Sequence, residues 1–173
     1  MMRQMLADRF GLRVRVDSEP ASVTVLTLIK PGVLGRGVRP APEGCTMPPA
    51  GVNLGSPKFA EVALRSCVFT FFDGRIRGTG TLDELARVTS FMAQRPILNE
   101  TGLTGMFAVD VTASISSIMP ARPSRFGPSI TAEAENSPAF TDALRTQMGI
   151  AARTERRPIR LFVVEQVGPL VEN

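Results

Sequence analysis

The feature that most constrains this chain is an ordered pattern that occurs near both of its ends. A helix-like run over residues 140–148 stops at Gly149, two strand-like runs at 150–155 and 159–167 follow, and Pro169 closes the unit. The same order occurs 138 positions earlier without a gap. Six pairs of positions keep their identity: Leu6 and Leu144, Gly11 and Gly149, Arg15 and Arg153, Pro20 and Pro158, Val25 and Val163, and Pro31 and Pro169. The repeat indicates that one supersecondary unit builds more than one part of the scaffold.

A middle segment shows the same order more loosely. Thr81 and Glu84 have the spacing of a helix capping box, and Pro96 ends the helix that follows. A strand, a glycine turn and a second strand complete this segment, at 96–100, 101–105 and 106–112.

Three such units predict an α+β fold of repeated helix–strand–strand units, with the helices packed against mainly antiparallel sheet. Gly11 and Gly149 would end helices in the left-handed conformation, and Pro20 and Pro158 would form hairpin corners. A chain of 173 residues is long enough for one compact domain with a substantial core. We therefore expect a single domain over 1–173, with its units at about 1–31, 81–113 and 137–169.

Two segments between the units lack clear periodicity. Residues 32–80 are interrupted by glycine and proline and form an irregular insertion, apart from a short β-like run at 67–72. Residues 114–136 are rich in serine, proline and alanine, and we expect them to form a mobile loop.

Cys45 and Cys67 are the only cysteines, and both lie in the irregular insertion. Two cysteines around a weakly structured loop favour a disulfide, which implies an oxidising compartment. The alternative is two unrelated buried thiols, because spacing along the chain does not establish the bond geometry.

Composition excludes several classes of protein. The hydrophobic fraction of 43% and the charged fraction of 21% are ordinary for a globular chain. No apolar run approaches the roughly 18 residues of a membrane-spanning helix, so we expect no transmembrane segment. The N-terminal residues are amphipathic and lack the continuous apolar core of a signal peptide, so we expect no export signal in this chain.

The net charge of +4 comes almost entirely from arginine, since Lys30 and Lys58 are the only lysines. Such a charge can attract nucleic acid or an anionic membrane. We favour the alternative of scattered arginines, because no continuous basic run occurs and acids lie near the densest groups, at 13–15 and 153–157. Since neither Trp nor Tyr is present to stack on bases, we do not expect a nucleic-acid partner.

The chain has no histidine, which excludes Ser-His-Asp and Cys-His catalytic arrangements and typical closed zinc sites. Neither the Walker pattern nor the dinucleotide-binding fingerprint occurs. We therefore expect no metal and no cofactor, and carboxylate chemistry is the kind of catalysis that remains.

Glu100 and Asp110 flank the glycine turn of the middle segment, so they could meet across a hairpin and act as acid and base or bind a hard cation. The alternative that we favour is that both are solvated hairpin residues. The further binding candidates are Asn99, Thr101, Phe69 and Phe71. The two phenylalanines could line an apolar ligand groove, although their alternation fits ordinary strand packing better.

The segment 95–105, Arg-Pro-Ile-Leu-Asn-Glu-Thr-Gly-Leu-Thr-Gly, resembles a turn of a soil-associated family of uncharacterised proteins abundant in acidobacterial genomes. Other motifs of that family recur along nearly the whole chain: Met-Leu-Ala-Asp-Arg-Phe at 5–10, Thr-Leu-Asp-Glu-Leu-Ala at 81–86 and Phe-Thr-Asp-Ala-Leu-Arg-Thr-Gln-Met-Gly at 140–149. Family members usually carry a further N-terminal region with an export signal, so the resemblance implies that this chain corresponds to their later part.

This chain departs from the family's pattern on both sides of the turn. The family commonly has an Asp-Lys pair before it, where this chain has Asn99 and Glu100. An aromatic–Asp pair after it is replaced by Phe107 and Ala108. An ion pair formed there in the family is therefore not carried over to this chain.

The family is similar in layout to small envelope modules such as the short N-terminal domains of secretins and TonB-dependent receptors. Some members are attached to membrane peptidases that resemble antibiotic sensors. The resemblance implies, by analogy, a periplasmic or extracellular binding or sensing module without catalytic activity, whose partner is an unidentified protein or small ligand. A carboxylate-based enzyme, such as a hydrolase, is the alternative. A continuous arginine face would favour a nucleic-acid binder, and the sequence does not define the oligomeric state.

Overall fold

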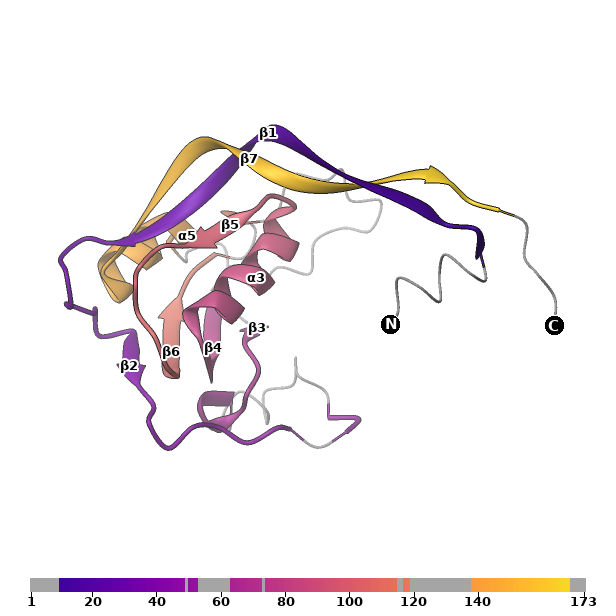
Figure 1. The fold of residues 1–173 in the computed structure, drawn as a ribbon. Coiled ribbons are helices and arrows are strands. Elements are labelled where there is room, and N and C mark those ends of the chain that lie inside the picture. Colours follow the sequence, from indigo (N-terminus) through magenta and orange to yellow (C-terminus); the bar gives the residue numbers. More distant parts are fainter. Residues whose placement is uncertain are drawn as a thin grey trace, which may run out of the picture. The chain divides into compact units, whose positions relative to one another are not determined.

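The computed structural model describes residues 10–48, 50–52, 63–72, 74–114, 117–118 and 138–168 (Figure 1). The chain divides into two compact units, a larger one at 23–155 and a smaller one formed by 1–22 and 156–173. The described elements are β1 (Arg13–Leu28), β2 (Val38–Pro40), the 3₁₀ turn η1 (Ala63–Arg65), β3 (Thr70–Phe72), β4 (Arg75–Gly80), α3 (Leu82–Ala93), β5 (Ile97–Asn99), β6 (Phe107–Thr112), α5 (Phe140–Ala143), the π-helical turn η3 (Leu144–Met148) and β7 (Ile150–Gln166).

The strands form two sheets, with the strand orders β5-β1-β7 and β2-β6-β4-β3. β1 is parallel to β5, whereas all neighbours in the four-stranded sheet are antiparallel. β1 and β7 run in opposite directions, as two backbone hydrogen bonds show. The N–H of Ile29 donates to the carbonyl oxygen of Gly149 (2.9 Å), and the N–H of Gly168 donates to that of Phe10 (2.7 Å).

The predicted α+β fold of repeated helix–strand–strand units is wrong, because the fold is mostly β and its strands form two separate sheets. β5 and β6 do not form the expected hairpin but belong to different sheets. Pro20 and Pro158 are not hairpin corners, since β1 and β7 continue through them. A strand accommodates proline where no ladder hydrogen bond needs its missing N–H, as at an edge. The predicted repeat of helix–strand–strand units is therefore also wrong: the segments after Gly11 and Gly149 form the single long strands β1 and β7, which pair with each other.

The helix α3 begins and ends as its sequence predicts. Thr81 Oγ1 accepts from the N–H of Glu84 (3.1 Å), and Glu84 Oε2 accepts from the N–H of Thr81 (2.8 Å), which completes the capping box. The buried face of the helix consists of Leu82, Leu85, Ala86, Thr89 and Ala93. This face belongs to the core of the larger unit, together with buried side chains of β1, β4, β6 and β7.

The second helical segment, α5 followed by η3, ends at Gly149 in the predicted left-handed conformation (φ 73°). Its last carbonyl groups accept from the segment that leads into β2. The N–H of Gly35 donates to the carbonyl oxygen of Met148 (2.9 Å), and the N–H of Gly37 donates to that of Gln147 (2.7 Å). The π-helical turn is thereby joined directly to a distant part of the chain.

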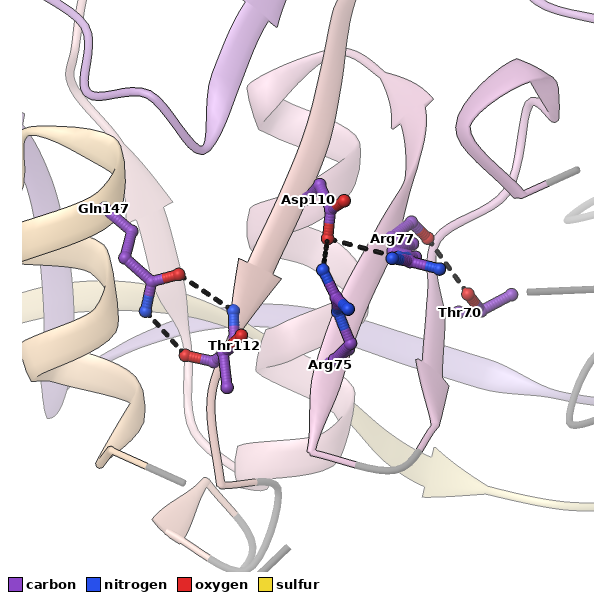
Figure 2. Close-up of polar contacts among 6 residues, drawn as sticks. All are labelled: Thr70, Arg75, Arg77, Asp110, Thr112 and Gln147. Atoms are coloured by element: carbon purple, nitrogen blue, oxygen red, sulfur yellow. Dashed lines mark hydrogen bonds and ion pairs between the residues drawn. The ribbon is translucent and has the colours of Figure 1, made fainter. Parts of the chain in front are cut away.

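The side chain of Gln147 forms hydrogen bonds with the backbone of Thr112, at the end of β6, as a neighbouring strand would (Figure 2). Gln147 Oε1 accepts from the N–H of Thr112 (2.9 Å), and Gln147 Nε2 donates to the carbonyl oxygen of Thr112 (2.7 Å). Thr112 is half-buried, so these two backbone groups depend on a side chain from the helical segment.

We expect Gln147→Ala to lower the free energy of unfolding by about 1–3 kcal/mol, because it removes both hydrogen bonds from a half-buried peptide group. Urea denaturation followed by circular dichroism measures the change. Gln166→Ala is the matched control: it removes the same side chain from an exposed position at the end of β7 and should change the free energy of unfolding by less than about 0.5 kcal/mol. An unchanged urea midpoint for Gln147→Ala would show that these bonds contribute nothing.

Parts of the predicted layout lie outside the described residues. The helix predicted before Gly11 is described only at Phe10, and the predicted loop at 114–136 only at 114 and 117–118. Pro169 also lies outside them. In the insertion at 32–80 the structure describes β2, η1, β3 and β4.

Candidate functional site

Asp110 lies on β6 and accepts from two arginines of β4 (Figure 2). Its Oδ1 is 3.0 Å from Nη2 of Arg75 and 3.1 Å from Nε of Arg77. The side chains of Asp110 and Arg77 are half-buried, whereas that of Arg75 is exposed. Two charge-assisted hydrogen bonds to one oxygen hold this carboxylate in an ion-pair cluster that links neighbouring strands.

Glu100 directly follows β5, in the other sheet, and borders an open groove between α3 and β5. This groove has a volume of about 580 Å³, and Asp83, Arg87 and Asn99 also line it, whereas Asp110 does not. Within the described residues, the structure therefore does not bring Glu100 and Asp110 together in one pocket. Their role as acid and base stays a prediction.

Asn99 and Thr101 form the turn that follows β5. Asn99 Nδ2 donates to Asp83 Oδ1 (3.0 Å), while Asn99 Oδ1 accepts from both the hydroxyl (2.7 Å) and the N–H (3.2 Å) of Thr101. The hydroxyl of Thr101 in turn accepts from the N–H of Leu103 (3.3 Å). Because these polar atoms have partners within the chain, the contacts favour a structural role for both side chains.

Phe69 and Phe71 are half-buried and pack against the hydrophobic core. The ring of Phe69 lies against β4 at two glycines. A Cβ built on Gly78 or Gly80 would come within 2.9 Å or 2.8 Å of that ring. This close approach favours ordinary strand packing for Phe69 over a ligand groove.

Cys45 and Cys67 are joined by a disulfide, which confirms the favoured interpretation of the sequence. Backbone hydrogen bonds run alongside it: the N–H of Thr46 donates to the carbonyl oxygen of Arg65 (2.8 Å), and the N–H of Cys67 donates to that of Thr46 (3.0 Å). The covalent bond therefore ties two segments that are also paired through their backbones.

The smaller unit contains a two-stranded ribbon, which we define as residues 13–22 of β1 and 156–166 of β7. In Figure 1 it comprises the indigo start of β1 and the yellow end of β7. Arg15 contacts Asp17 in its own strand (2.9 Å) and Glu165 in the other strand (3.0 Å). These three charged side chains therefore lie on one face of the ribbon.

The opposite face of the ribbon carries exposed apolar side chains. Because successive residues of a strand point to opposite faces, Val16 points away from the side of Arg15, and Phe162 and Val164 point away from the side of Glu165. Val16, Phe162 and Val164 are 48%, 72% and 54% exposed. We call these three residues the ribbon face.

Positive charge accompanies the ribbon face along β7. Exposed and half-buried residues alternate strictly over 156–164, which places Arg156 and Arg160 on the same side of the strand as Phe162. The two carboxylates that contact Arg15 lie on the other side. The ribbon face thus combines an apolar surface with two arginines next to it.

The ribbon face was not predicted from the sequence, because Pro158 was expected to form a hairpin corner and the residues after it a separate short strand. The signal was nevertheless present in the order Ile-Arg-Leu-Phe-Val-Val at 159–164. Ile159, Leu161 and Val163 lie on one face of this strand, and Phe162 and Val164 lie on the other, so both faces carry apolar side chains. A strand of this kind in a two-stranded ribbon leaves one apolar face without cover.

The model of the DUF3738 family, described as a protein of unknown function, matches residues 1–167. The chain belongs to the DUF3738 family. Membership in a family of uncharacterised proteins confirms that part of the resemblance, and it assigns no activity to any residue. No curated protein and no solved structure matches this DUF3738 chain.

Neither a metal-binding cluster nor a membrane-spanning helix occurs in the described part of this DUF3738 chain. No group of three or more Cys, Asp or Glu side chains in it is arranged to hold a metal ion. No helix in it has both the length and the apolar character that crossing a bilayer requires.

Proposed function

We propose that this chain is a non-catalytic binding module that takes up an extended segment of a partner protein along the ribbon face. The observation that carries the proposal is the 72% exposure of Phe162, next to Val164 on the same side of β7. Exposed aromatic side chains that a partner can bury supply much of the binding energy at protein interfaces.

The strand order favours addition of a partner strand to β7. β7 is an edge strand of the three-stranded sheet, and an edge strand presents backbone N–H and C=O groups that an extended peptide can pair with. A two-stranded ribbon is only marginally stable in water without a third strand or other cover. A strand added next to β7 would place its side chains beside Phe162 and Val164, where cross-strand apolar contacts stabilise the pair.

The charges define the chemistry of the partner segment. Its side chains on the side of the ribbon face would lie next to Arg156 and Arg160 at one end and next to Phe162 and Val164 at the other. Acidic residues complement the first pair and apolar residues complement the second. For a partner strand parallel to β7, the proposed segment is therefore extended, with acidic side chains followed by apolar side chains at alternate positions.

A location outside the cytoplasm is part of the proposal. The bond between Cys45 and Cys67 fits an oxidising compartment, because thiols in the cytoplasm are kept reduced. The resemblance to a soil-associated family, and to the layout of small envelope modules, supports the periplasm or the cell exterior as that compartment.

Binding of a designed peptide tests the proposal. The peptide carries glutamates and then valines at alternate positions, and its affinity is measured by fluorescence anisotropy. We expect saturable binding that Phe162→Ser weakens roughly thirtyfold, which corresponds to about 2 kcal/mol for a central aromatic contact. Backbone amide signals of 159–165 should shift on binding in nuclear magnetic resonance spectra.

The control is Phe91→Ser, since Phe91 on α3 is also a phenylalanine and is 86% exposed. Phe91→Ser should leave the affinity unchanged, and a peptide with lysines in place of the glutamates should bind at least about tenfold more weakly. No binding, equal binding of the lysine peptide, or equal losses for the two serine variants would each overturn the proposal.

A further inference from the structure

A second surface feature lies wholly within the larger unit, in a groove with two lobes. The larger lobe has a volume of about 420 Å³ and lies between the end of β1, the helical segment and the start of β7. The smaller lobe has a volume of about 200 Å³ and continues along the residues that follow β1. Ile29 and Arg145 line both lobes, so the two lobes adjoin at these side chains.

Three cationic side chains line this groove. Arg153 lines the larger lobe, Lys30 lines the smaller one, and Arg145 lies where the lobes meet. All three residues are exposed, and none of them forms an ion pair with another described residue. Asp142 is the one acidic residue among those that line the two lobes. The groove therefore gathers an excess of positive charge that the described residues do not neutralise.

Apolar residues line both lobes beside the cations. Leu28, Ile29 and Ala152 line the larger lobe, and Val33 and Leu34 line the smaller one. Ile29 is 46% exposed and Val33 is 55% exposed, so apolar surface is accessible beside the cations. Apolar residues together with a few polar groups are typical of sites for small molecules, and the larger lobe exceeds the lower end of their usual volume, about 300 Å³.

The backbone around the groove is already engaged in hydrogen bonds. The N–H of Ile29 donates to the carbonyl oxygen of Gly149 (2.9 Å), and the N–H of Gly35 donates to that of Met148 (2.9 Å). These two N–H groups are therefore not available to a ligand. Arg145 projects from η3, a π-helical turn, and turns of this kind occur frequently at functional sites.

We propose that this groove binds a free medium-chain carboxylate, with the alkyl chain against Ile29 and its apolar neighbours and the carboxylate beside Arg145. Guanidinium groups bind carboxylates through two parallel hydrogen bonds. Lys30 and Arg153 add positive charge on either side of that contact. The groove lies in the larger unit, so this site is independent of the ribbon face and of the binding function proposed for it.

Titration with octanoate, followed by nuclear magnetic resonance, tests this site. Octanoate should bind saturably at one site and shift the amide signals of residues 28–30 and 145. Acetate carries the head group alone and octanol the alkyl chain alone, and each should bind at least about tenfold more weakly, because binding needs both parts. Arg145→Gln and Arg153→Gln should each weaken octanoate binding about five- to tenfold.

Arg39→Gln is the matched control, since Arg39 is exposed on β2 and does not line either lobe. It removes the same charge and should change the affinity less than twofold. Asp142→Asn should strengthen binding, because it removes the one acidic side chain of the groove. The proposal would be overturned if octanoate did not bind, or if octanol or acetate bound as tightly as octanoate. It would also be overturned if Arg39→Gln lost as much affinity for octanoate as Arg145→Gln. Stronger binding to vesicles of anionic phospholipid that Arg145→Gln abolishes would overturn it as well, because the ligand would then be a membrane surface.

Discussion

Gly35→Ala is expected to lower the free energy of unfolding by about 3 kcal/mol or more, as overpacking against rigid neighbours does. A Cβ built on Gly35 would overlap the carbonyl oxygen of Gln147 and lie 2.6 Å from its carbonyl carbon and 2.8 Å from that of Met148. All three atoms belong to the backbone of the π-helical turn, so no side-chain rotation relieves the overlap. Moving the chain away would also break the hydrogen bond between the N–H of Gly35 and Met148.

Gly44→Ala is the control for the cost of adding a methyl group to a glycine. Gly44 has a φ of 75°, and a Cβ built on it would meet no atom within 4 Å. The expected loss there is about 1 kcal/mol, from the left-handed conformation alone. Urea denaturation of both variants measures the difference. Equal losses for Gly35→Ala and Gly44→Ala would mean that the contact with the π-helical turn is not tight.

Removing the disulfide, by Cys45→Ala together with Cys67→Ala, is expected to lower the free energy of unfolding by about 3 kcal/mol. The two cysteines are 22 positions apart, and closing a loop of about this length restricts the unfolded chain by that amount. The backbone hydrogen bonds of Thr46 and Cys67 do not replace this restriction, because they are lost on unfolding. Urea denaturation under oxidising conditions measures the loss.

A reducing agent provides the control for the disulfide prediction. It should move the urea midpoint of the unsubstituted protein toward that of the double variant, and it should not affect the double variant. Two free thiols in the air-oxidised protein would contradict the prediction. So would a urea midpoint of the unsubstituted protein that the reducing agent does not change. Either result would also remove the support that the disulfide gives to an oxidising compartment.

Local features of the fold could be predicted from the sequence because both partners lie close together in the chain. The capping box joins Thr81 to Glu84, three residues later. Gly149 ends a helical segment through its own backbone conformation. The disulfide is a longer-range case, and the sequence favoured it because its two cysteines surround a weakly structured loop.

Strand partners could not be predicted in the same way. β5 pairs in parallel with β1, so that Ile97 lies opposite Thr24, whereas the sequence predicted that it pairs with the next strand along the chain. Short strands such as β5 carry too few residues for a pattern that selects one neighbour over another. The choice depends on which sheet buries the most apolar surface against α3 and the rest of the core.

The candidate site residues show the same difference between contacts of chain neighbours and contacts between strands. Asn99 and Thr101 were predicted as binding candidates, and the structure joins them to each other by hydrogen bonds at the end of β5. Asp110 was predicted to meet Glu100 across a hairpin that does not form, and its contacts are instead with Arg75 and Arg77 of β4. Contacts between residues that are close in the chain could therefore be predicted, whereas contacts between strands depend on which strands pair and in which register.

The sequence by itself determined the capping box that begins α3, the glycine that ends the second helical segment, and the fact that Cys45 and Cys67 can pair only with each other. These features depend on local backbone preferences and on composition. Only the tertiary structure decided that the two similar ends of the chain pair as β1 and β7, and that Phe162 is exposed while Ile150 is buried. It also brought Lys30, Arg145 and Arg153 to one groove. These outcomes depend on the pairing of residues more than 100 positions apart, for which local sequence patterns carry little information.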